Sequence, residues 1–129
     1  MKKISIIILI YFYFFISIAS SEMTIVAKST NKSSFYVDFD SIKKKSGYIY
    51  YWGLTDYNKV KSTGTRSIKY FYELDCDLMR YKFLTDHAYT GHKGNGEVTI
   101  NNTPDKEWRY LVPDSAGYFQ NQKACNFIK

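Results

Sequence analysis

The sequence predicts an α+β domain, in which an antiparallel meander β-sheet carries a C-terminal α-helix on one face and a disulfide ties the two together. Three observations support this fold class. Consecutive segments alternate apolar and polar residues with a period of two, which is typical of half-buried strands. The segment after residue 115 changes to a helical spacing of apolar residues. The two cysteines, Cys76 and Cys125, fall on the apolar side of a predicted strand and of the predicted helix.

The N-terminus predicts a signal peptide. Lys2 and Lys3 form a positive start, residues 4–16 are an uncharged apolar run, and the small residues Ser17 and Ala19 suit cleavage after Ala19. A membrane anchor is the alternative, but the apolar stretch is shorter than the roughly 20 residues that span a bilayer core. No cysteine lies at this boundary. We therefore expect an exported chain, periplasmic or at the cell surface, with no lipid anchor and no stable membrane span after cleavage.

The chain that remains after cleavage has the length of one domain. We divide the chain into a signal peptide (1–19), a short N-terminal segment (20–33) and a folded domain (34–129). The mature chain keeps 16 of the 18 basic residues against 12 acidic ones, a formal charge of +4. This mild excess favours an anionic partner but lacks the density of a nucleic-acid-binding arm, so we expect no nucleic acid among the partners.

The first strands lie in the N-terminal half. Residues 23–27 are compatible with a short strand, and residues 35–39 predict the next one. Residues 43–47 are three lysines followed by serine and glycine, and they predict a turn because glycine accepts positive φ. This turn leads into an aromatic-rich strand at residues 48–57. A polar loop follows at residues 58–64.

The strand pattern is clearest at residues 67–76. Its two faces are an apolar set, Ile68, Tyr70, Tyr72, Leu74 and Cys76, and a mixed set that includes Lys69, Phe71 and Glu73. Residues 78–85 repeat the alternation, with Arg80 and Lys82 on the polar side. After a glycine-rich loop at 90–96, further strands are predicted at 97–101 and 107–112. This succession of neighbouring strands predicts a meander.

The C-terminal helix is predicted to begin at a cap formed by Asp114 or Ser115. Its apolar stripe is Tyr118, Phe119, Gln122, Cys125 and Ile128. Because Cys76 and Cys125 both lie on buried faces of an exported chain, we expect them to form a structural disulfide. Closing a loop of roughly 50 residues is worth about 4 kcal/mol in the chain-entropy model. A reactive thiol pair is the alternative, but the spacing is not CxxC.

A series of short motifs runs from residue 34 to residue 125. These are Tyr36-Val37-Asp38, residues 41–45, residues 47–52, Asp56-Tyr57, Asp75-Cys76, residues 104–108 and Cys125. In this order and spacing they resemble the surface-adhesin protein E family. The resemblance implies an antiparallel sheet with a disulfide-tied C-terminal helix, exposure beyond the cytoplasmic membrane and, as for the family's namesake, binding to host extracellular-matrix proteins.

The residues themselves do not predict an enzyme or a cofactor. His87 and His92 lie near Asp86 and Glu97, so one alternative function is an envelope hydrolase with a metal site at the His87/His92 loop. However, a spacing of five residues puts the two histidines on opposite faces of an extended chain, and no HExxH motif is present. We expect instead a non-catalytic domain whose partner is an extracellular or envelope protein, while the oligomeric state stays open.

Aromatic residues give the strongest indication of a binding surface. Tyr48, Tyr50 and Trp52 share one face of a strand that follows a run of lysines, and one helix can cover only one face of the sheet. The candidate partner-binding residues are therefore Lys43, Lys44, Lys45, Tyr48, Tyr50 and Trp52. We expect them on the face opposite the helix, together with Lys69, Glu73, Arg80 and Lys82. The alternative is a tyrosine-rich core with amphipathic rims.

Overall fold

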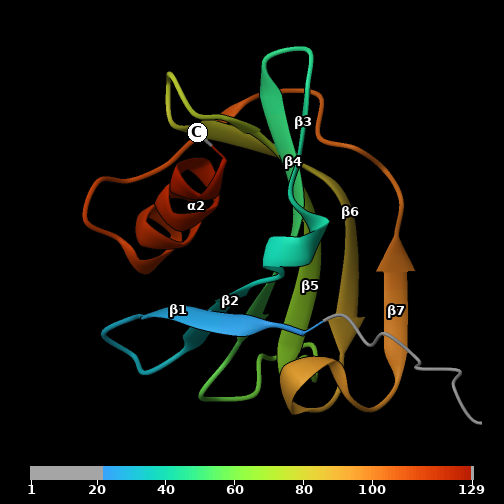
Figure 1. Ribbon diagram of the computed structural model, residues 1–129. Coiled ribbons are helices and arrows are strands. Elements are labelled where there is room, and N and C mark those ends of the chain that lie inside the picture. Colours follow the sequence, from blue (N-terminus) through green and yellow to red (C-terminus); the bar gives the residue numbers. More distant parts are fainter. Residues whose placement is uncertain (1–21, 129) are drawn as a thin grey trace, which may run out of the picture.

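The computed structural model describes residues 22–128, so the predicted signal peptide lies outside the described residues. Within this range eight strands form one antiparallel sheet. Helix α2, Ala116–Phe127, packs on one face of the sheet (Figure 1). The predicted fold class is confirmed.

The sheet is a meander over most of its width. Neighbouring strands follow the order β1-β2-β4-β5-β6-β7, while β3 pairs with β4 and β8 pairs with β6. The strands are β1 (Thr24–Lys28), β2 (Ser34–Val37), β3 (Lys43–Lys45), β4 (Tyr48–Asp56), β5 (Ser67–Asp75), β6 (Arg80–Tyr89), β7 (Val98–Asn101) and β8 (Arg109–Tyr110). Strands β4, β5 and β6 are the long central ones. Three short strands, β1, β2 and β3, lie on the β4 side of this centre, and two, β7 and β8, lie on the β6 side.

The short strands share the outer edges of the central ones. Strands β2 and β3 both pair with the same strand, β4, at its two ends, and the 3₁₀ helix Phe39–Ser41 connects them. In the same way β8 and β7 both pair with β6, at its start and at its end. No single long strand therefore forms either flank of the central three strands.

Two predicted elements differ from the structure at the lysine run. The prediction of a turn at residues 43–47 is wrong for the lysines, since Lys43–Lys45 form β3 and only Ser46 and Gly47 make the turn. Both turn residues have positive φ, 51° and 84°. A two-residue hairpin needs this backbone because its twist matches the twist of the paired strands. Strand β2 also ends at Val37, before the predicted end at residue 39.

Other boundaries shift for similar reasons. Strand β6 begins at Arg80, and Met79 has a φ of 48° in the turn that precedes it. The strand predicted at 107–112 is reduced to Arg109–Tyr110, since only these residues pair with β6. The predicted helix start is confirmed at Ser115, whose Oγ accepts a hydrogen bond from the Tyr118 N–H at 3.1 Å.

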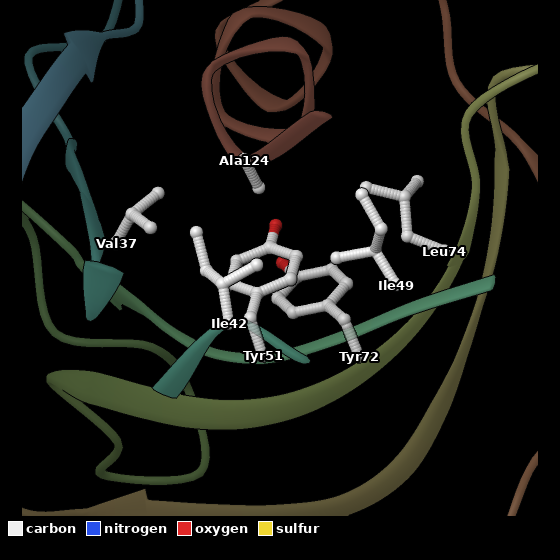
Figure 2. Packing of buried hydrophobic residues seen from close by; sticks show 7 residues of the cluster. All are labelled: Val37, Ile42, Ile49, Tyr51, Tyr72, Leu74 and Ala124. Carbon is white, nitrogen blue, oxygen red and sulfur yellow. The ribbon is translucent and has the colours of Figure 1, made fainter. Parts of the chain in front are cut away.

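The core lies between the sheet and α2. Its buried side chains are Val37, Ile42, Ile49, Tyr51, Tyr72, Leu74 and Ala124 (Figure 2). At its centre the rings of Tyr51 and Tyr72 stack on neighbouring strands, with their centroids 4.7 Å apart. Aromatic side chains thus supply much of the apolar area that a small sheet must bury.

The buried side of α2 is more polar than the predicted stripe. Gln120, Asn121 and Ala124 face the sheet, whereas Phe119, which was predicted on the buried stripe, is 43% exposed. Gln120 Oε1 accepts a hydrogen bond from the Tyr72 hydroxyl at 3.1 Å, and its Nε2 donates to the Tyr36 carbonyl at 2.9 Å. The helix therefore docks through paired polar groups, which a search for apolar spacing cannot detect.

Gly53 allows the helix to approach β4 closely. A Cβ atom at this position would lie 2.9 Å from Gln120 Nε2 and 2.9 Å from a ring carbon of Tyr72. Real side chains do not tolerate such contacts without a shift, so the glycine is needed for packing. It sits between two strongly β-favouring segments of the same strand.

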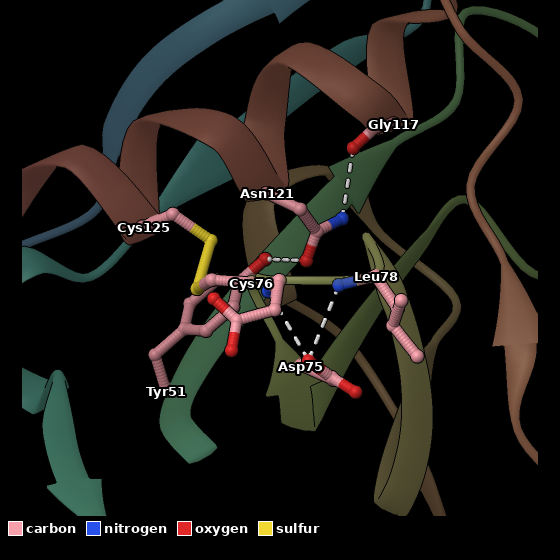
Figure 3. Close-up of a disulfide and its surroundings, with 8 residues drawn as sticks. Tyr51, Asp75, Cys76, Leu78, Gly117, Asn121 and Cys125 are labelled. Atoms are coloured by element: carbon pink, nitrogen blue, oxygen red, sulfur yellow. Dashed lines mark hydrogen bonds between the residues drawn. A yellow bond between two sulfur atoms is a disulfide. The ribbon is translucent and has the colours of Figure 1, made fainter. Parts of the chain in front are cut away.

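The predicted disulfide between Cys76 and Cys125 is confirmed (Figure 3). It joins the end of β5 to α2, with the two Cα atoms 5.9 Å apart. Next to it Asp75 Oδ1 accepts hydrogen bonds from the backbone N–H groups of Asp77 and Leu78, and so fixes the turn into β6. The bridge and this turn together anchor the C-terminal helix.

Candidate binding face

The face of the sheet opposite α2 carries most of the predicted site. Alternate strand residues point to opposite sides, and Ile49 and Tyr51 point into the core. Tyr48, Tyr50 and Trp52 must then point away from the helix, as predicted. All three are partly exposed.

The register divides the three lysines of β3 between the two faces. Lys43 lies opposite Tyr50 and Lys45 opposite Tyr48, so both share the face of these tyrosines. Lys44 lies opposite the buried Ile49, which places it on the helix side. Five of the six predicted residues therefore share one face, and Lys44 lies beside them on β3 at a register position of the other face.

Trp108 forms one end of this face. Its ring lies 5.2 Å from the ring of Tyr48, and the cationic groups of Arg80 and Lys82 lie over it at 4.6 and 4.8 Å from the centroid. Such cation–π contacts hold long basic side chains in place. Trp108 was not predicted as a site residue. It reaches this face because the adjacent strand β8 pairs with β6.

Trp52 forms the other end. Its ring lies 5.0 Å from Phe71 and 5.2 Å from His87, and Lys69 Nζ lies 5.2 Å from its centroid. The arrangement repeats the one at Trp108, with a cation held over an indole. Two tryptophan–cation groups thus lie on the same face of the central strands.

A groove of about 500 Å³ lies between these two groups. Tyr50, Phe71 and Leu84 line it, and β3 forms its basic wall. Leu84 reaches the groove because β6 contains a bulge: Phe71 pairs with Thr85 and Tyr72 with Phe83, so Leu84 has no partner on β5. The groove is therefore apolar at its floor and positive along one side.

Glu73 is the acidic member of this surface. Its carboxylate accepts a hydrogen bond from the Tyr50 hydroxyl at 3.2 Å. Partial burial, reinforced by the nearby negative charge of Glu73, raises the pKa of Tyr50 above its usual value. Tyr50 is thus a neutral hydrogen-bond donor held in a defined orientation at the rim of the groove.

We call this surface the aromatic–basic face. It consists of Lys43, Lys45, Tyr48, Tyr50, Trp52, Lys69, Phe71, Glu73, Arg80, Lys82, Leu84, His87 and Trp108. Its charged side chains comprise five basic residues and one acidic residue, so its formal charge is positive. Among its members, Phe71, Leu84 and Trp108 were not predicted as site residues, and His87 was considered only for the alternative metal site.

The two histidines occupy different surroundings. The ring of His87 packs at a tilt against Trp52 on the aromatic–basic face, whereas His92 lies in the loop after β6. Both ring nitrogens of His92 are engaged, Nδ1 by Asp56 at 2.9 Å and Nε2 by Arg66 at 3.0 Å. Within residues 22–128 no group of three or more His, Cys, Asp or Glu side chains is arranged to hold a metal ion.

A family model described as Surface-adhesin protein E matches residues 23–126, which is nearly all of the described chain. The chain belongs to this family. None of the curated protein sequences is similar enough to count as a relative. Membership in a surface-adhesin family places the protein outside the cytoplasm.

Solved structures of Haemophilus influenzae protein E share the fold of this family member. Crystal form II of that protein has 17% sequence identity and a TM-score of 0.63, and the match covers 85% of this chain and 95% of the other. A second structure has 20% identity, a TM-score of 0.60 and coverages of 83% and 86%. Protein E from non-typeable Haemophilus influenzae matches with 16% identity, a TM-score of 0.54 and coverages of 86% and 80%. At such identities the likeness concerns the fold alone.

None of the helices in residues 22–128 combines the length and the apolar character needed to cross a bilayer. The segment predicted to be the signal peptide precedes this range.

Proposed function

We propose that this member of the surface-adhesin protein E family is an exported, non-catalytic binding protein, adhesive toward a host or envelope protein, and that the aromatic–basic face contacts this ligand. One observation supports the proposal above others. Two tryptophan–cation groups flank an apolar groove on the sheet face that α2 leaves uncovered. Exposed tryptophan, tyrosine and arginine are the residues that contribute most to protein–protein interfaces.

The electrostatics of the face favour an anionic ligand segment. Five basic side chains accompany Glu73, so a negative partner would be attracted and its association accelerated. The apolar floor of Phe71 and Leu84 would accept an aliphatic or aromatic side chain of the same segment. An acidic protein segment that contains an apolar residue therefore fits the groove best.

The location of the mature protein follows from its N-terminus. Cleavage after Ala19 would release a chain whose boundary carries no cysteine for lipid attachment. We infer that it acts in the periplasm or at the cell surface without a lipid anchor. The alternative of a metal-dependent hydrolase finds no support in the surroundings of His87 and His92.

The test begins with the mature chain, residues 20–129, as bait for proteins of extracellular-matrix extracts and bacterial envelope extracts. The ligand recovered is then measured by biolayer interferometry against Lys43→Glu/Lys45→Glu. We expect the association rate to fall about tenfold, with a smaller difference at high salt, because charge steering is screened. Circular dichroism checks that the variant is folded.

The matched control is Lys28→Glu/Lys123→Glu, which changes the charge equally at two exposed lysines that lie outside the groove and its walls. This variant should bind like the wild type. An equal loss in both variants would mean that net charge alone matters, and unchanged binding by Lys43→Glu/Lys45→Glu would remove the aromatic–basic face from consideration.

A further inference from the structure

A second cleft lies at the opposite end of β4, between two loops. One loop is the turn between β1 and β2, and the other follows β4 at residues 57–61. The antiparallel pairing of Ser34 with Asp56 brings the two loops side by side. Since β4 has nine residues, this cleft is roughly 25–30 Å from the turn at Ser46 and Gly47. It is thus a separate site.

The cleft collects positive charge without a carboxylate. The nine residues that line it include Lys32, Lys59 and Lys61 and neither aspartate nor glutamate. None of the salt bridges found within residues 22–128 involves these lysines. Like charges gathered in one cleft repel one another, and a bound anion would offset this electrostatic repulsion.

Two of the loop positions are held by the fold. Lys61 Nζ lies 4.4 Å from the centroid of the Tyr57 ring and 3.4 Å from its hydroxyl, so the ring orients the ammonium group. Lys32 occupies a left-handed backbone position, with a φ of 65°, at the end of a turn closed by the bond from its N–H to the Ser29 carbonyl. Lys32 and Lys61 therefore project from defined positions of their loops.

Buried Ser33 joins the two walls. Its hydroxyl accepts a hydrogen bond from the Asn58 N–H at 3.3 Å, and its own N–H donates to Asn31 Oδ1 at 3.2 Å. Because Ser33 ties one loop to the other, the backbone segments that carry the three lysines are held relative to one another. This is the preorganisation that a small-molecule site requires.

The remaining lining indicates the class of ligand. Thr30, Asn31 and Asn58 offer hydroxyl and amide groups, and Val60 is the sole aliphatic side chain among the nine lining residues. The volume of about 530 Å³ exceeds that of a bare inorganic anion. A polyhydroxylated ligand that carries a negative group matches both the polar walls and the lysines.

We propose that this cleft binds an anionic saccharide, whose tetrahedral oxyanion, a sulfate ester or a phosphate, is held by Lys32, Lys59 and Lys61. A sulfated host glycan and a phosphorylated envelope sugar share this chemistry. The site works independently of the aromatic–basic face, so the protein would have one surface for a protein ligand and another for a sugar.

Isothermal titration calorimetry of the mature chain with three probes tests the proposal. The probes are a sulfated heparin tetrasaccharide, the same tetrasaccharide after chemical desulfation, and a phosphorylated glucosamine. We expect one or both anionic probes to bind, with weaker binding at high salt, and the desulfated probe not to bind. Stronger binding of the sulfated probe identifies a host glycan as the source, and stronger binding of the phosphorylated probe identifies an envelope sugar.

The variant Lys32→Gln/Lys59→Gln/Lys61→Gln should weaken this binding by about tenfold or more, since three charge-assisted contacts are removed. The control Lys43→Gln/Lys45→Gln/Lys69→Gln loses the same charge from the aromatic–basic face and should bind the saccharide normally. Chemical-shift changes at the Asn31 and Asn58 amides locate the ligand. The proposal is overturned if neither anionic probe binds, if the desulfated probe binds equally well, or if the control variant loses binding instead of the cleft variant.

Discussion

At the scale of single residues, buried tyrosine hydroxyls connect the sheet to the helix. Tyr51 donates a hydrogen bond to Asn121 Oδ1 at 2.6 Å, and Tyr72 donates to Gln120 Oε1. Burial raises the pKa of both hydroxyls well above the usual value, so they remain protonated donors. Asn121 Nδ2 in turn donates to the Gly117 carbonyl. Because every partner is paired, this polar contact can be buried without a large penalty.

Tyr51→Phe tests the value of this pairing. The substitution leaves Asn121 Oδ1 buried without its donor, so the free energy of unfolding should fall by about 1–3 kcal/mol. Urea denaturation followed by circular dichroism measures the change. Tyr48→Phe is the matched control, because Tyr48 is partly exposed, and it should alter stability much less.

A double variant distinguishes a lost hydrogen bond from lost packing. Tyr51→Phe/Asn121→Leu removes both polar partners, and it should recover part of the stability that Tyr51→Phe loses, since no unpaired oxygen remains. If the double variant is less stable than the sum of the single changes, packing and not pairing controls this contact.

Asp75 gives the stability a dependence on acid pH. Burial alone would raise the pKa of Asp75, but hydrogen bonds from Arg80 and from the backbone of Leu78 and Asp77 outweigh it and lower the pKa. A lowered folded pKa contributes stability that is present above the unfolded value of about 3.9 and is lost as pH falls toward the folded value. Asp75→Asn should therefore be less stable than wild type at neutral pH.

The difference between the Asp75→Asn variant and the wild type should shrink below about pH 4, because Asp75 itself then becomes protonated. Thermal melts across acidic and neutral pH measure it. A difference that stays constant over this range would show that the carboxylate charge does not contribute. Arg80 is partly exposed, so screening limits the effect of this ion pair.

At the scale of elements, the sequence predicted the central strands well and the short ones less well. Strand β5 matches its predicted range closely, and Tyr72 and Leu74 of its predicted apolar face are buried in the core, whereas Ser67 and Asp75 of the other face are buried as well. Strand β3 was missed because three consecutive lysines carry no alternation and resemble a solvated turn. Its strand conformation comes from pairing with β4, which is a tertiary effect.

The helix illustrates a different limit. Its start was predicted from capping chemistry, which is local, and this succeeded. Its buried face was predicted from apolar spacing, which failed at Phe119 because Gln120 and Asn121 face the sheet instead. The tyrosine hydroxyls on β4 and β5 and the Tyr36 carbonyl on β2 explain that choice, and they are distant in sequence.

The disulfide should account for much of the attachment of α2. Cys76→Ser/Cys125→Ser is expected to lower the free energy of unfolding by about 2–5 kcal/mol, because the unfolded chain gains the freedom of the opened loop. Amide hydrogen exchange should speed up in α2 more than in β4 and β5. Equal acceleration everywhere would indicate that the bridge stabilises the whole domain rather than the helix. The double variant is compared with wild-type protein whose disulfide has been reduced.

At the scale of the whole molecule, the sequence predicted the face of the candidate site but not all of the residues that lie on it. Alternation in residues 48–52, together with a single covering helix, was enough to place Tyr48, Tyr50 and Trp52. Trp108 joins them through the pairing of β8 with β6, and Leu84 through a bulge. The alternation of apolar and polar residues reveals neither the pairing of distant strands nor a bulge. These two residues could therefore not be predicted.

The tyrosine-rich core predicts how the molecule responds to alkali. Burial raises the pKa of Tyr51, Tyr70 and Tyr72 above the unfolded value of about 10. A raised folded pKa contributes stability that is fully present below about pH 10 and is lost as pH rises beyond it. We expect stability to be level near neutral pH and to fall steeply above about pH 10.

Ultraviolet absorbance titration measures this response. A fraction of the tyrosines should ionise only together with the loss of circular dichroism, whereas the guanidinium-unfolded chain should titrate as one class. Ionisation of all tyrosines in a chain that stays folded would contradict the role of burial.

The lysine strand β3 also affects how the molecule avoids self-association. Within the described residues β3 pairs only with β4, so its outer edge is exposed, and such an edge can recruit a strand from another chain and start aggregation. Three adjacent ammonium groups make this recruitment unfavourable, because a second copy would bring the same charges to the same edge. A short, strongly charged edge thus disfavours edge-to-edge pairing between folded copies of the chain.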